Sequence, residues 1–250
     1  MPTTERPREP RQLIDGRATG ETLALLRDGD LEVVGRLVVS SNSALLCRLD
    51  GDAAVCIYKP TSFERPLHDF SDGTLGRRET AAYLVSDSAG LGIVPPTILR
   101  DGPFGEGAVQ LWVTPDEAID PIELVETDDP RLRPIALFDA VVNNADRKIG
   151  HLLPLSSGAI LGVDHGICFH AEPKLRTVLW AWRGERFTEA ESKLLAVIGG
   201  ALDGALGVEL GELLSEDEVA ATRDRVARLM ADGRFPQPDP DRPAIPWPPY

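Results

Sequence analysis

Cysteine, positive charge and long apolar runs are all scarce in this sequence, and each shortage excludes a class of protein. The three cysteines are odd in number and form no Cys-X-X-Cys pair, so a disulfide framework is not expected. Cys47, Cys56 and Cys168 each lie in an apolar run, which predicts buried thiols in a reducing compartment. No apolar stretch approaches the roughly 18–20 residues that span a bilayer, and residues 1–12 lack the apolar core of a signal peptide. We therefore expect a cytoplasmic protein.

Positive charge is outnumbered throughout the chain. Lysine and arginine number 26 against 40 aspartates and glutamates, which leaves a formal net charge of −14. Such a surface repels phosphate backbones and anionic headgroups, so we expect no nucleic-acid partner and no stable membrane insertion. A local basic patch is compatible with this balance, and the acidity otherwise favours solubility. With 42% hydrophobic residues, the composition excludes a wholly disordered, collagen-like or coiled-coil chain.

Proline is concentrated at the two ends. Ten of the 21 prolines lie in residues 1–10 and 236–250. Residues 1–12 are predicted to be a disordered arm, and residues 235–250 an extended, polyproline-like tail. Ile245, Trp247 and Tyr250 favour a tail that packs along the body, although a ligand for a proline-binding module has a similar composition.

Between these ends the hydrophobic pattern changes from strands to helices. In the first half, alternating or apolar runs predict strands over residues 31–39, 44–49, 52–58 and 109–113 and near Ile98, with helices over 21–26 and 76–89. In the second half, helices are predicted over 132–143, 189–198 and 216–232, with short strands over 151–153 and 160–163. Ser215 and Glu218 form the capping box of the last helix.

This order of elements predicts an α+β fold in two lobes, an antiparallel sheet with one helix followed by a mostly helical part. The expected N-lobe covers residues 13–113 and the expected C-lobe covers 131–234. The Pro- and Asp-rich residues 114–130 are the expected hinge or linker.

A lysine and a glutamate stand where a phosphate clamp would need them. Lys59 ends the third predicted strand, before Pro60, and Glu79 follows 20 residues later on a predicted helix. Protein kinases pair a strand lysine with a helix glutamate to bind the α- and β-phosphates. On these two residues alone, an ordinary surface lysine and glutamate are the simpler interpretation.

A polar segment follows the predicted helix 132–143 and leads directly into an apolar strand. It has the sequence Asn143-Asn144-Ala145-Asp146-Arg147-Lys148-Ile149-Gly150-His151. Charged side chains next to a buried strand lose hydration, which lowers the stability of the fold, so we expect them to have a function there. A second carboxylate, Asp164, follows the next strand in Val163-Asp164-His165-Gly166, a pattern that alone is typical of a strand-end turn. The order of these groups along the chain is a more specific signal than any one of them. Phosphoryl transfer needs a cation that binds the phosphates, a carboxylate that holds this cation, a base and acidic metal ligands.

At this point the chain resembles the phosphatidylinositol 3-/4-kinase superfamily, which has a protein-kinase-like fold. The likeness is greatest to type II phosphatidylinositol 4-kinases and to a bacterial family related to them. It covers about half the chain, residues 40–169, in six blocks: Ser40-Ser41-Asn42-Ser43, Ile57-Tyr58-Lys59-Pro60 with Glu64-Arg65-Pro66, Arg78-Glu79-Thr80-Ala81-Ala82-Tyr83-Leu84-Val85, Ile93-Val94-Pro95-Pro96-Thr97, Asn144-Ala145-Asp146-Arg147, and Val163-Asp164-His165-Gly166.

The resemblance implies roles for the nucleotide-binding residues. Lys59 would bind the α-phosphate of ATP, held by Glu79. The serine-rich turn would cap the phosphates through Ser41, Asn42 and Ser43. The backbone of the adenine-contacting hinge would come from Gln110, Leu111, Trp112 and Val113.

The resemblance also implies the catalytic and metal residues. Asp146 would be the catalytic-loop aspartate, and Asp164 would bind Mg²⁺. Apart from the resemblance, we expect Arg147 and Lys148 to be catalytic residues that add positive charge to the cleft, with Lys148 stabilising the transferring phosphoryl group. His151 stands where the family has an asparagine metal ligand, and a neutral imidazole suits Mn²⁺ or Zn²⁺ better than Mg²⁺, which prefers oxygen. His151 is therefore either a ligand with altered metal preference or a loop histidine whose role a neighbour such as Asn144 takes.

These features together predict an ATP-dependent phosphotransferase that moves the γ-phosphoryl group to a hydroxyl. The net charge of −14 disfavours an inositol lipid, and residues 170–186 lack a strongly basic stretch, so a protein or a soluble metabolite is the favoured acceptor. Trp180 and Trp182 in that stretch suggest a packed strand or a substrate platform. Two alternatives remain open, a nucleotide-binding pseudokinase with a regulatory role and an enzyme that transfers AMP.

Overall fold

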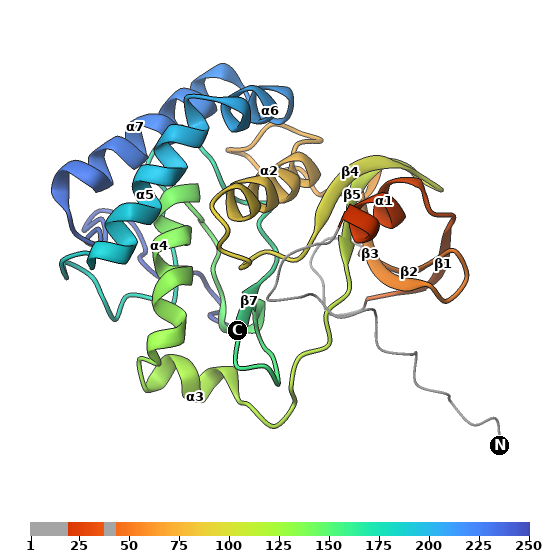
Figure 1. The fold of residues 1–250 in the computed structure, drawn as a ribbon, viewed down its shortest axis with the longest axis horizontal. Coiled ribbons are helices and arrows are strands. Elements are labelled where there is room, and N and C mark those ends of the chain that lie inside the picture. Colours follow the sequence, from red (N-terminus) through yellow and green to blue (C-terminus); the bar gives the residue numbers. More distant parts are fainter. Residues whose placement is uncertain (1–19, 38–43) are drawn as a thin grey trace.

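Five antiparallel strands form a sheet from the first half of the chain (Figure 1). The computed structural model describes residues 20–37 and 44–250. The sheet order is β1-β2-β3-β5-β4, so β3 lies at its centre. The elements of this half are α1 (Gly20–Asp28), β1 (Leu31–Arg36), β2 (Leu45–Leu49), β3 (Ala54–Pro60), a 3₁₀ turn (Thr61–Phe63), α2 (Leu75–Ser88), β4 (Thr97–Gly102) and β5 (Gly105–Leu111).

One face of the sheet is closed by an apolar cluster of its own. Strand β3 is buried over most of its length, as its Val-Cys-Ile-Tyr run predicts for a central strand. Its neighbours and α1 complete a cluster made of Leu26, Leu45, Cys47, Leu49, Ala54, Cys56, Tyr58, Val109 and Leu111. All three cysteines are buried and free, which confirms the prediction from their apolar surroundings. The sheet therefore holds the end of β3 in a fixed position.

The second half of the chain is mostly helical. It consists of α3 (Pro121–Glu126), a 3₁₀ turn (Pro130–Leu132), α4 (Arg133–Val142), a 3₁₀ turn (Ile149–His151), β6 (Leu152–Pro154), β7 (Ile160–Gly162), α5 (Glu189–Leu202), α6 (Ala205–Leu213) and α7 (Glu216–Asp232). Ser215 and Glu218 form the predicted capping box at the start of α7. The antiparallel sheet followed by this helical part confirms the predicted α+β fold class.

Helix α2 lies between the sheet and the C-terminal helices in Figure 1. Although it belongs to the first half of the sequence, its Ala81, Ala82 and Val85 are fully buried in the core of the helical part. At its N-terminus, Glu64 accepts hydrogen bonds from the amides of Leu75 and Gly76, at 3.1 and 2.9 Å. A carboxylate at this position stabilises a helix through its unpaired amides and its dipole. Helix α2 is thus fixed at its start and along one face.

The observed elements differ from the predicted ones at several places. Residues 114–130 were expected to be a linker, yet they contain α3, which begins with Asp120 as N-cap and Pro121 at its first turn. Helix α6 was not predicted because Gly207 and Gly211 interrupt its helical pattern. The predicted arm of residues 1–12 and the turn with Ser41, Asn42 and Ser43 lie outside the described residues.

The proline-rich tail is held by its backbone. The carbonyl of Ala244 accepts from the amide of Thr177 at 3.0 Å, and that of Pro249 accepts from the amide of Ile149 at 2.8 Å. Its apolar side chains, which were expected to pack along the body, are largely exposed: Ile245 (50%), Trp247 (87%) and Tyr250 (72%).

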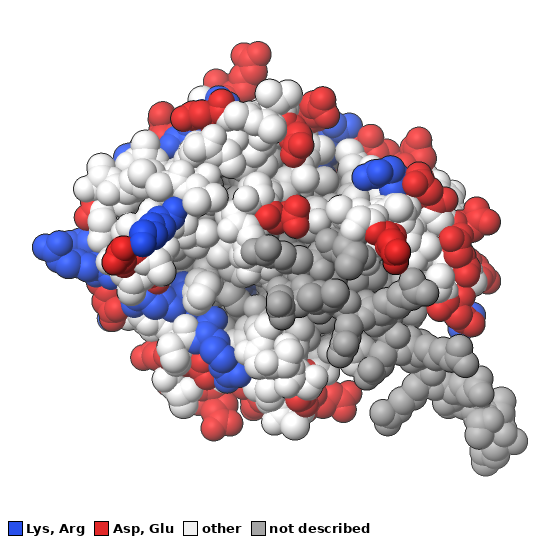
Figure 2. Space-filling model, in the orientation of Figure 1, with Lys and Arg blue, Asp and Glu red and all other residues white. Residues whose placement is uncertain are grey.

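The surface carries the acidic balance of the sequence. On the face in Figure 2, Asp and Glu side chains are spread over the visible surface and outnumber Lys and Arg. Among the described helices, none is by itself long and apolar enough to cross a membrane, and only α5 and α6 taken together, with a bend of 69° between them, reach that length and composition.

Candidate active site

Lys59 lies between two carboxylates that come from distant parts of the chain. Its Nζ atom is 2.5 Å from Oε1 of Glu79 on α2 and 3.0 Å from Oδ1 of Asp164, which follows β7. Lys59 lies near the C-terminal end of the central strand β3, where its side chain is 20% exposed. The structure thus brings together three of the residues that the sequence singled out.

The second oxygen of Glu79 is also used. Its Oε2 accepts a hydrogen bond from the amide of His165 at 3.0 Å, and the side chain is only 3% exposed. Glu79 therefore connects β3, α2 and the segment after β7. Its position depends on α2, whose first turn is capped by Glu64.

The charges of this cluster stabilise one another. The Lys59 ammonium lowers the pKa of Asp164 far below its ordinary value, because the attraction exceeds the cost of burial. Burial opposes the charge of Lys59, yet Asp164 and Glu79 together raise its pKa above the usual range. Asp164 has a φ of 63°, a conformation that is uncommon for a residue with a side chain and is concentrated at functional sites.

Gly166 is needed for the space it leaves and not for its backbone angle. In this turn the positive φ belongs to Asp164. A Cβ atom at Gly166 would instead lie 3.3 Å from Cβ of Leu75, tighter than most such contacts. The glycine therefore allows the start of α2 to approach the Asp164 segment.

Asp146 lies in the same cleft and is held by its neighbours. Its Oδ2 is 3.2 Å from Nζ of Lys148, and its Oδ1 is 4.0 Å from a guanidinium nitrogen of Arg176. The amide of Asp146 donates to Oδ1 of Asn144 at 2.9 Å, which fixes the loop. Burial raises the pKa of the Asp146 carboxyl, and Lys148 offsets part of that rise. A raised pKa makes a carboxylate a better proton acceptor.

Arg147, expected in the cleft, lies in the core instead. Its side chain is 0% exposed and its guanidinium donates to both carboxylate oxygens of Asp139, at 2.9–3.2 Å. It also donates to the carbonyl of Val163 at 3.0 Å. Gly162 leaves the space it needs, since a Cβ atom there would be 3.1 Å from the guanidinium. Arg147 is therefore a positioning residue that connects α4 to the strand before Asp164, and the prediction of direct catalysis by it is corrected.

His151 faces Asp164 but is oriented as a hydrogen-bond donor. Its Nε2 is 3.4 Å from Oδ2 of Asp164, and its Nδ1 accepts from the amide of Lys148 at 3.4 Å. A neutral imidazole whose Nδ1 accepts carries its proton on Nε2. Burial lowers the pKa of His151 to about 4, so the ring is neutral at pH 7. Asn144, the alternative ligand, is occupied by Asp139 and the amide of Asp146.

The carboxylates of the cleft suit Mg²⁺ bound together with substrate phosphates. Asp164 is 45% exposed and Asp146 is 20% exposed, so both can reach a cation. In the described part of the chain, no three His, Cys, Asp or Glu residues converge into a complete cage. Mg²⁺ is typically held by one or two carboxylates, substrate phosphates and water, so this donor set fits it.

The segment expected to contact adenine is mostly enclosed. Gln110 is 6% exposed and its side chain donates to Thr97 at 2.8 Å. The amides of Leu111 and Trp112 donate to the carbonyls of Pro96 and Val55. Within the described residues, the backbone of Val113 forms no hydrogen bond and the residue is half-buried, so its backbone is the part of this segment that a ligand can reach.

Two cavities meet at Asp146. The smaller, about 40 Å³, is lined by Lys59, Glu79, Asp164 and their neighbours. The larger, about 700 Å³, lies against the loop 173–176, α7 and the tail. Asp146 and Ile167 line both of them. A group bound in one cavity is therefore adjacent to a group bound in the other.

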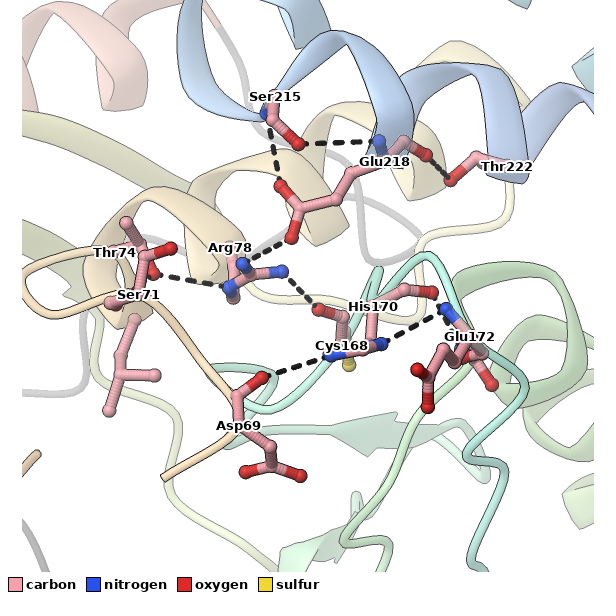
Figure 3. A network of polar contacts seen from close by, with 12 residues as sticks. Asp69, Ser71, Thr74, Arg78, Cys168, His170, Glu172, Ser215, Glu218 and Thr222 are labelled. Carbon is pink, nitrogen blue, oxygen red and sulfur yellow. Dashed lines mark hydrogen bonds and ion pairs between the residues drawn. The ribbon is translucent and has the colours of Figure 1, made fainter. Parts of the chain in front are cut away.

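A polar network holds the segment after Asp164 against α2 and α7 (Figure 3). Arg78 of α2, next to Glu79, donates to the carbonyl of Cys168 at 2.7 Å and to Glu218 of α7 at 2.5 Å. His170 continues the network by its ring contact to the carbonyl of Asp69 at 2.9 Å. Of the two tryptophans in this stretch, Trp182 is packed in the core and Trp180 lines the larger cavity.

Sequence reasoning assigned no individual roles to several residues on which the site depends. Asp139 is an acidic residue within the apolar run that fills the rest of helix α4 after Arg133, a pattern that indicates a buried partner of opposite charge. Glu64 stands within a block that supported the resemblance, yet its capping of α2 requires a contact over 11 residues of chain. His165 contributes its amide to Glu79, a role that no side-chain pattern reveals.

Comparison with known proteins identifies one curated relative. The chain is 41% identical over 264 residues to Protein Rv2133c of Mycobacterium tuberculosis, covering 91% of this chain and 95% of that protein. No known family profile matches the chain. Among solved structures, a proinflammatory kinase of Helicobacter pylori, CtkA, superposes on 82% of this chain and 98% of its own with 13% identity and a TM-score of 0.45. A likeness of that size carries no argument about function.

Proposed function

The chain belongs to the same family as Protein Rv2133c of Mycobacterium tuberculosis, and we propose that it is an ATP-dependent phosphotransferase with a protein-kinase-like arrangement of its two lobes. The observation that supports this proposal is the position of Lys59 between Glu79 and Asp164, with Asp146 in the same cleft. Phosphoryl transfer requires a cation that binds the phosphates, a carboxylate that holds this cation, a second carboxylate that binds the metal ion and a proton acceptor. The six sequence blocks extend the proposal to a distant relation with the phosphatidylinositol 3-/4-kinase superfamily.

In this mechanism the nucleotide is bound by the lobes on either side of the cleft. When bound, ATP supplies the γ-phosphoryl group and Mg²⁺ or Mn²⁺ neutralises phosphate charge. Lys59 would bind the α-phosphate, and Glu79 would keep its ammonium in place. Asp164 would hold the metal ion. The turn with Ser41, Asn42 and Ser43 and the backbone near Val113 are proposed to contact the phosphates and adenine.

Asp146 is proposed to accept the proton of the attacking hydroxyl. Its pKa is raised by burial, which brings it closer to the range of a general base. Lys148, 3.2 Å away, would place a positive charge beside the transferring group. The acceptor is a hydroxyl of a small molecule or a protein, with an inositol lipid disfavoured by the net charge of −14.

The test is ADP release by the purified full chain, with ATP and Mg²⁺ or Mn²⁺, in wild type and Asp146→Asn. Loss of a general base lowers a rate by about 10²–10⁴-fold. Nucleotide binding, followed as a ligand-induced rise in melting temperature, should persist in the variant. Asp224→Asn, which removes an exposed carboxylate of α7, is the matched control. Equal ADP release by wild type and Asp146→Asn would refute the proposal.

A regulatory, nucleotide-binding role is favoured by one observation. Nε2 of His151 lies 3.4 Å from Asp164, at the position where the related kinases have an oxygen ligand, which would leave the metal site with one ligand fewer. Metal-dependent ATP binding without ADP release for any acceptor would support this role. Mass spectrometry of the products separates phosphate transfer from AMP transfer, because the two groups add different masses.

A further inference from the structure

The larger cavity has the size and position of a binding site for a second substrate. Its volume of about 700 Å³ lies within the range of about 300–1,000 Å³ for small-molecule sites. Its walls come from residues 67–70, the loop around Asn143–Asp146, residues 173–176, α7 and the tail. Phe70, Trp180 and Leu229 contribute apolar surface. Asp146 lines it, so a molecule here is adjacent to the residue proposed as the base.

The cavity is rich in cations for so acidic a protein. Five Lys or Arg residues line it, against four Asp, in a chain with a net charge of −14. Three of the cations have carboxylate partners. Lys174 lies 2.6 Å from Asp69, and Arg242 lies 3.4 Å from Glu172. Arg176 lies 4.0 Å from Asp146. The remaining cations are the two arginines of α7.

Arg225 and Arg228 share one face of α7, three residues apart, and neither forms an ion pair with a carboxylate of the described residues. Arg225 donates only to neutral groups, among them the carbonyls of Val141 at 2.9 Å and His170 at 3.1 Å. Burial lowers the pKa of Arg225 to about 10, and the charge of Arg228 adds to this effect. Asp232 also lines the cavity, yet it forms no ion pair with either arginine.

Arg176 continues this positive charge toward the reaction centre. Its guanidinium is 4.0 Å from Asp146 at the nearest approach, and its Nε atom is buried without a hydrogen-bond partner in the described chain. A partly buried guanidinium group with unused donors is stabilised by an anion. Arg176 and Arg225 are partly buried and Arg228 is exposed. Together they place positive charge in the same cavity as Asp146.

We propose that this cavity binds the acceptor, and that the acceptor is a small alcohol carrying a phosphate or carboxylate group that pairs with Arg225 and Arg228. The inference rests on the proposed function, whose acceptor class it specifies. The tail favours a small molecule over a polypeptide, because the carbonyl of Ala244 accepts from Thr177 and from the indole of Trp180 and so closes one side of the cavity.

The reaction would then proceed at the junction of the two cavities. The hydroxyl oxygen of the acceptor forms a bond to the γ-phosphorus as the bond from that phosphorus to the β,γ-bridging oxygen breaks. The electron pair of the broken bond stays with ADP, and the hydroxyl proton passes to Asp146. The products are ADP and an acceptor that carries one more phosphate.

The first experiment measures binding of inorganic pyrophosphate by calorimetry, without nucleotide or metal. Arg228→Gln should raise the dissociation constant about tenfold, the factor expected for one lost charge-assisted contact. The exposed control Lys193→Gln should leave it unchanged, since this residue does not line the cavity. Lys59→Ala reports binding of pyrophosphate at the proposed nucleotide site instead. Arg225→Lys is a second variant, because it keeps the charge and alters the geometry. Absent binding, or binding lost in Lys59→Ala but not in Arg228→Gln, overturns the inference.

The second experiment compares matched acceptors: glycerol with glycerol 3-phosphate, glycerate with 3-phosphoglycerate, and ribose with ribose 5-phosphate. A phosphorylated member should be used at least about tenfold better by kcat/KM, and Arg228→Gln should remove this preference through KM. ATP turnover with neutral alcohols or peptides and no effect of Arg228→Gln would overturn the inference and leave the proposed function standing. Pyrophosphate binding through Arg228 without ATP turnover would instead retain the anion site and refute the proposed function.

Discussion

Two clusters of opposite charges in this protein are similar in chemistry and differ in their access to water. In one, Arg147 and Asp139 are both 0% exposed, and Asn144 and Thr177 donate further hydrogen bonds to Asp139. In the other, Lys59 binds Glu79 and Asp164, whose side chain remains 45% exposed. The first cluster is sealed by protein, and the second opens onto a cavity.

This difference in exposure distinguishes a cluster that stabilises the fold from a cluster that a ligand can contact. A fully buried pair cannot contact a ligand. Its attraction instead stabilises the positions of α4, the loop of Asp146 and the strand that ends before Asp164. An open cluster can exchange a partner, so Asp164 is free to bind a cation while Glu79 retains Lys59. The two clusters are adjacent in space because Arg147 donates to the carbonyl of Val163, the neighbour of Asp164.

The largest effect on stability should follow from breaking the sealed pair. Arg147→Met leaves Asp139 charged and buried, which costs about 3–5 kcal/mol of unfolding free energy. Denaturant unfolding at pH 7 measures it. Arg147→Lys should recover part of the loss, because it keeps the charge without the two-pronged geometry. A variant as stable as wild type would show that Asp139 does not depend on this arginine.

In the open cluster the matched substitution should act on rate instead. Lys59→Met should lower ADP release about 10²–10³-fold, as loss of one preorganised electrostatic contact does. Its cost in unfolding free energy should be smaller than that of Arg147→Met, because water reaches Asp164 and Glu79 can take up a proton. Parallel turnover and unfolding measurements test this. A larger stability loss than in Arg147→Met would remove the distinction between the clusters.

A third ion pair, between Arg78 and Glu218, is intermediate in exposure between the two clusters, with side chains that are 3% and 15% exposed. Burial opposes the Glu218 charge, yet Arg78 and the amide of Ser215 hold the pKa of Glu218 below its ordinary value. A lowered folded-state pKa contributes stability above the unfolded value, and this contribution is lost as pH falls through the folded value. Glu218→Gln should therefore cost about 1–3 kcal/mol at pH 7.

The loss of stability caused by Glu218→Gln should become smaller as the pH falls. The gap between wild type and Glu218→Gln should close below pH 4.5, the ordinary value for this carboxyl. Unfolding midpoints measured from pH 7 down to pH 3 test this, with Glu216→Gln, exposed in the same helical turn, as control. A gap that is constant with pH would mean that ionisation of Glu218 does not matter.

The smallest effect is expected at the rim of the open cluster. His151→Asn keeps a neutral donor beside Asp164 and adds an oxygen ligand, so turnover should stay within about tenfold of wild type. The ratio of rates with Mg²⁺ and Mn²⁺ should shift toward Mg²⁺, which prefers oxygen. A hundredfold loss of turnover would instead assign His151 an essential role.

Much of the fold could be predicted because periodicity and capping are local. The alternating runs around β2 and β3, the helical spacing of α2 and the capping box at Ser215 depend on residues close in sequence. Helix α6 was missed because its glycines weaken the local signal. Helix α3 was missed although Asp120 and Pro121 gave a start signal, because it is only six residues long.

Within the candidate site, the sequence could indicate which residue types matter but not all of their positions. Lys59, Glu79, Asp146 and Asp164 meet in one cleft, as their order suggested. Arg147 and Lys148 are adjacent in sequence, yet one is fully buried in the core and the other lies in the cleft beside Asp146. Which of two neighbouring cations reaches the cleft depends on the direction of the backbone and on the space left by Gly162.

The sequence by itself determined the α+β order of elements, the acidic balance and the set of groups able to handle phosphate, because these follow from composition and from contacts a few residues apart. Only the tertiary structure decided which charges are sealed and which are open, and that unpaired arginines of α7 lie in the same cavity as Asp146. The physical reason is that burial and pairing are set by segments far apart in the chain, such as Lys59 and Asp164, which are 105 residues apart, and Arg78 and Glu218, which are 140 residues apart. Their meeting depends on how the sheet, α2 and α4 pack.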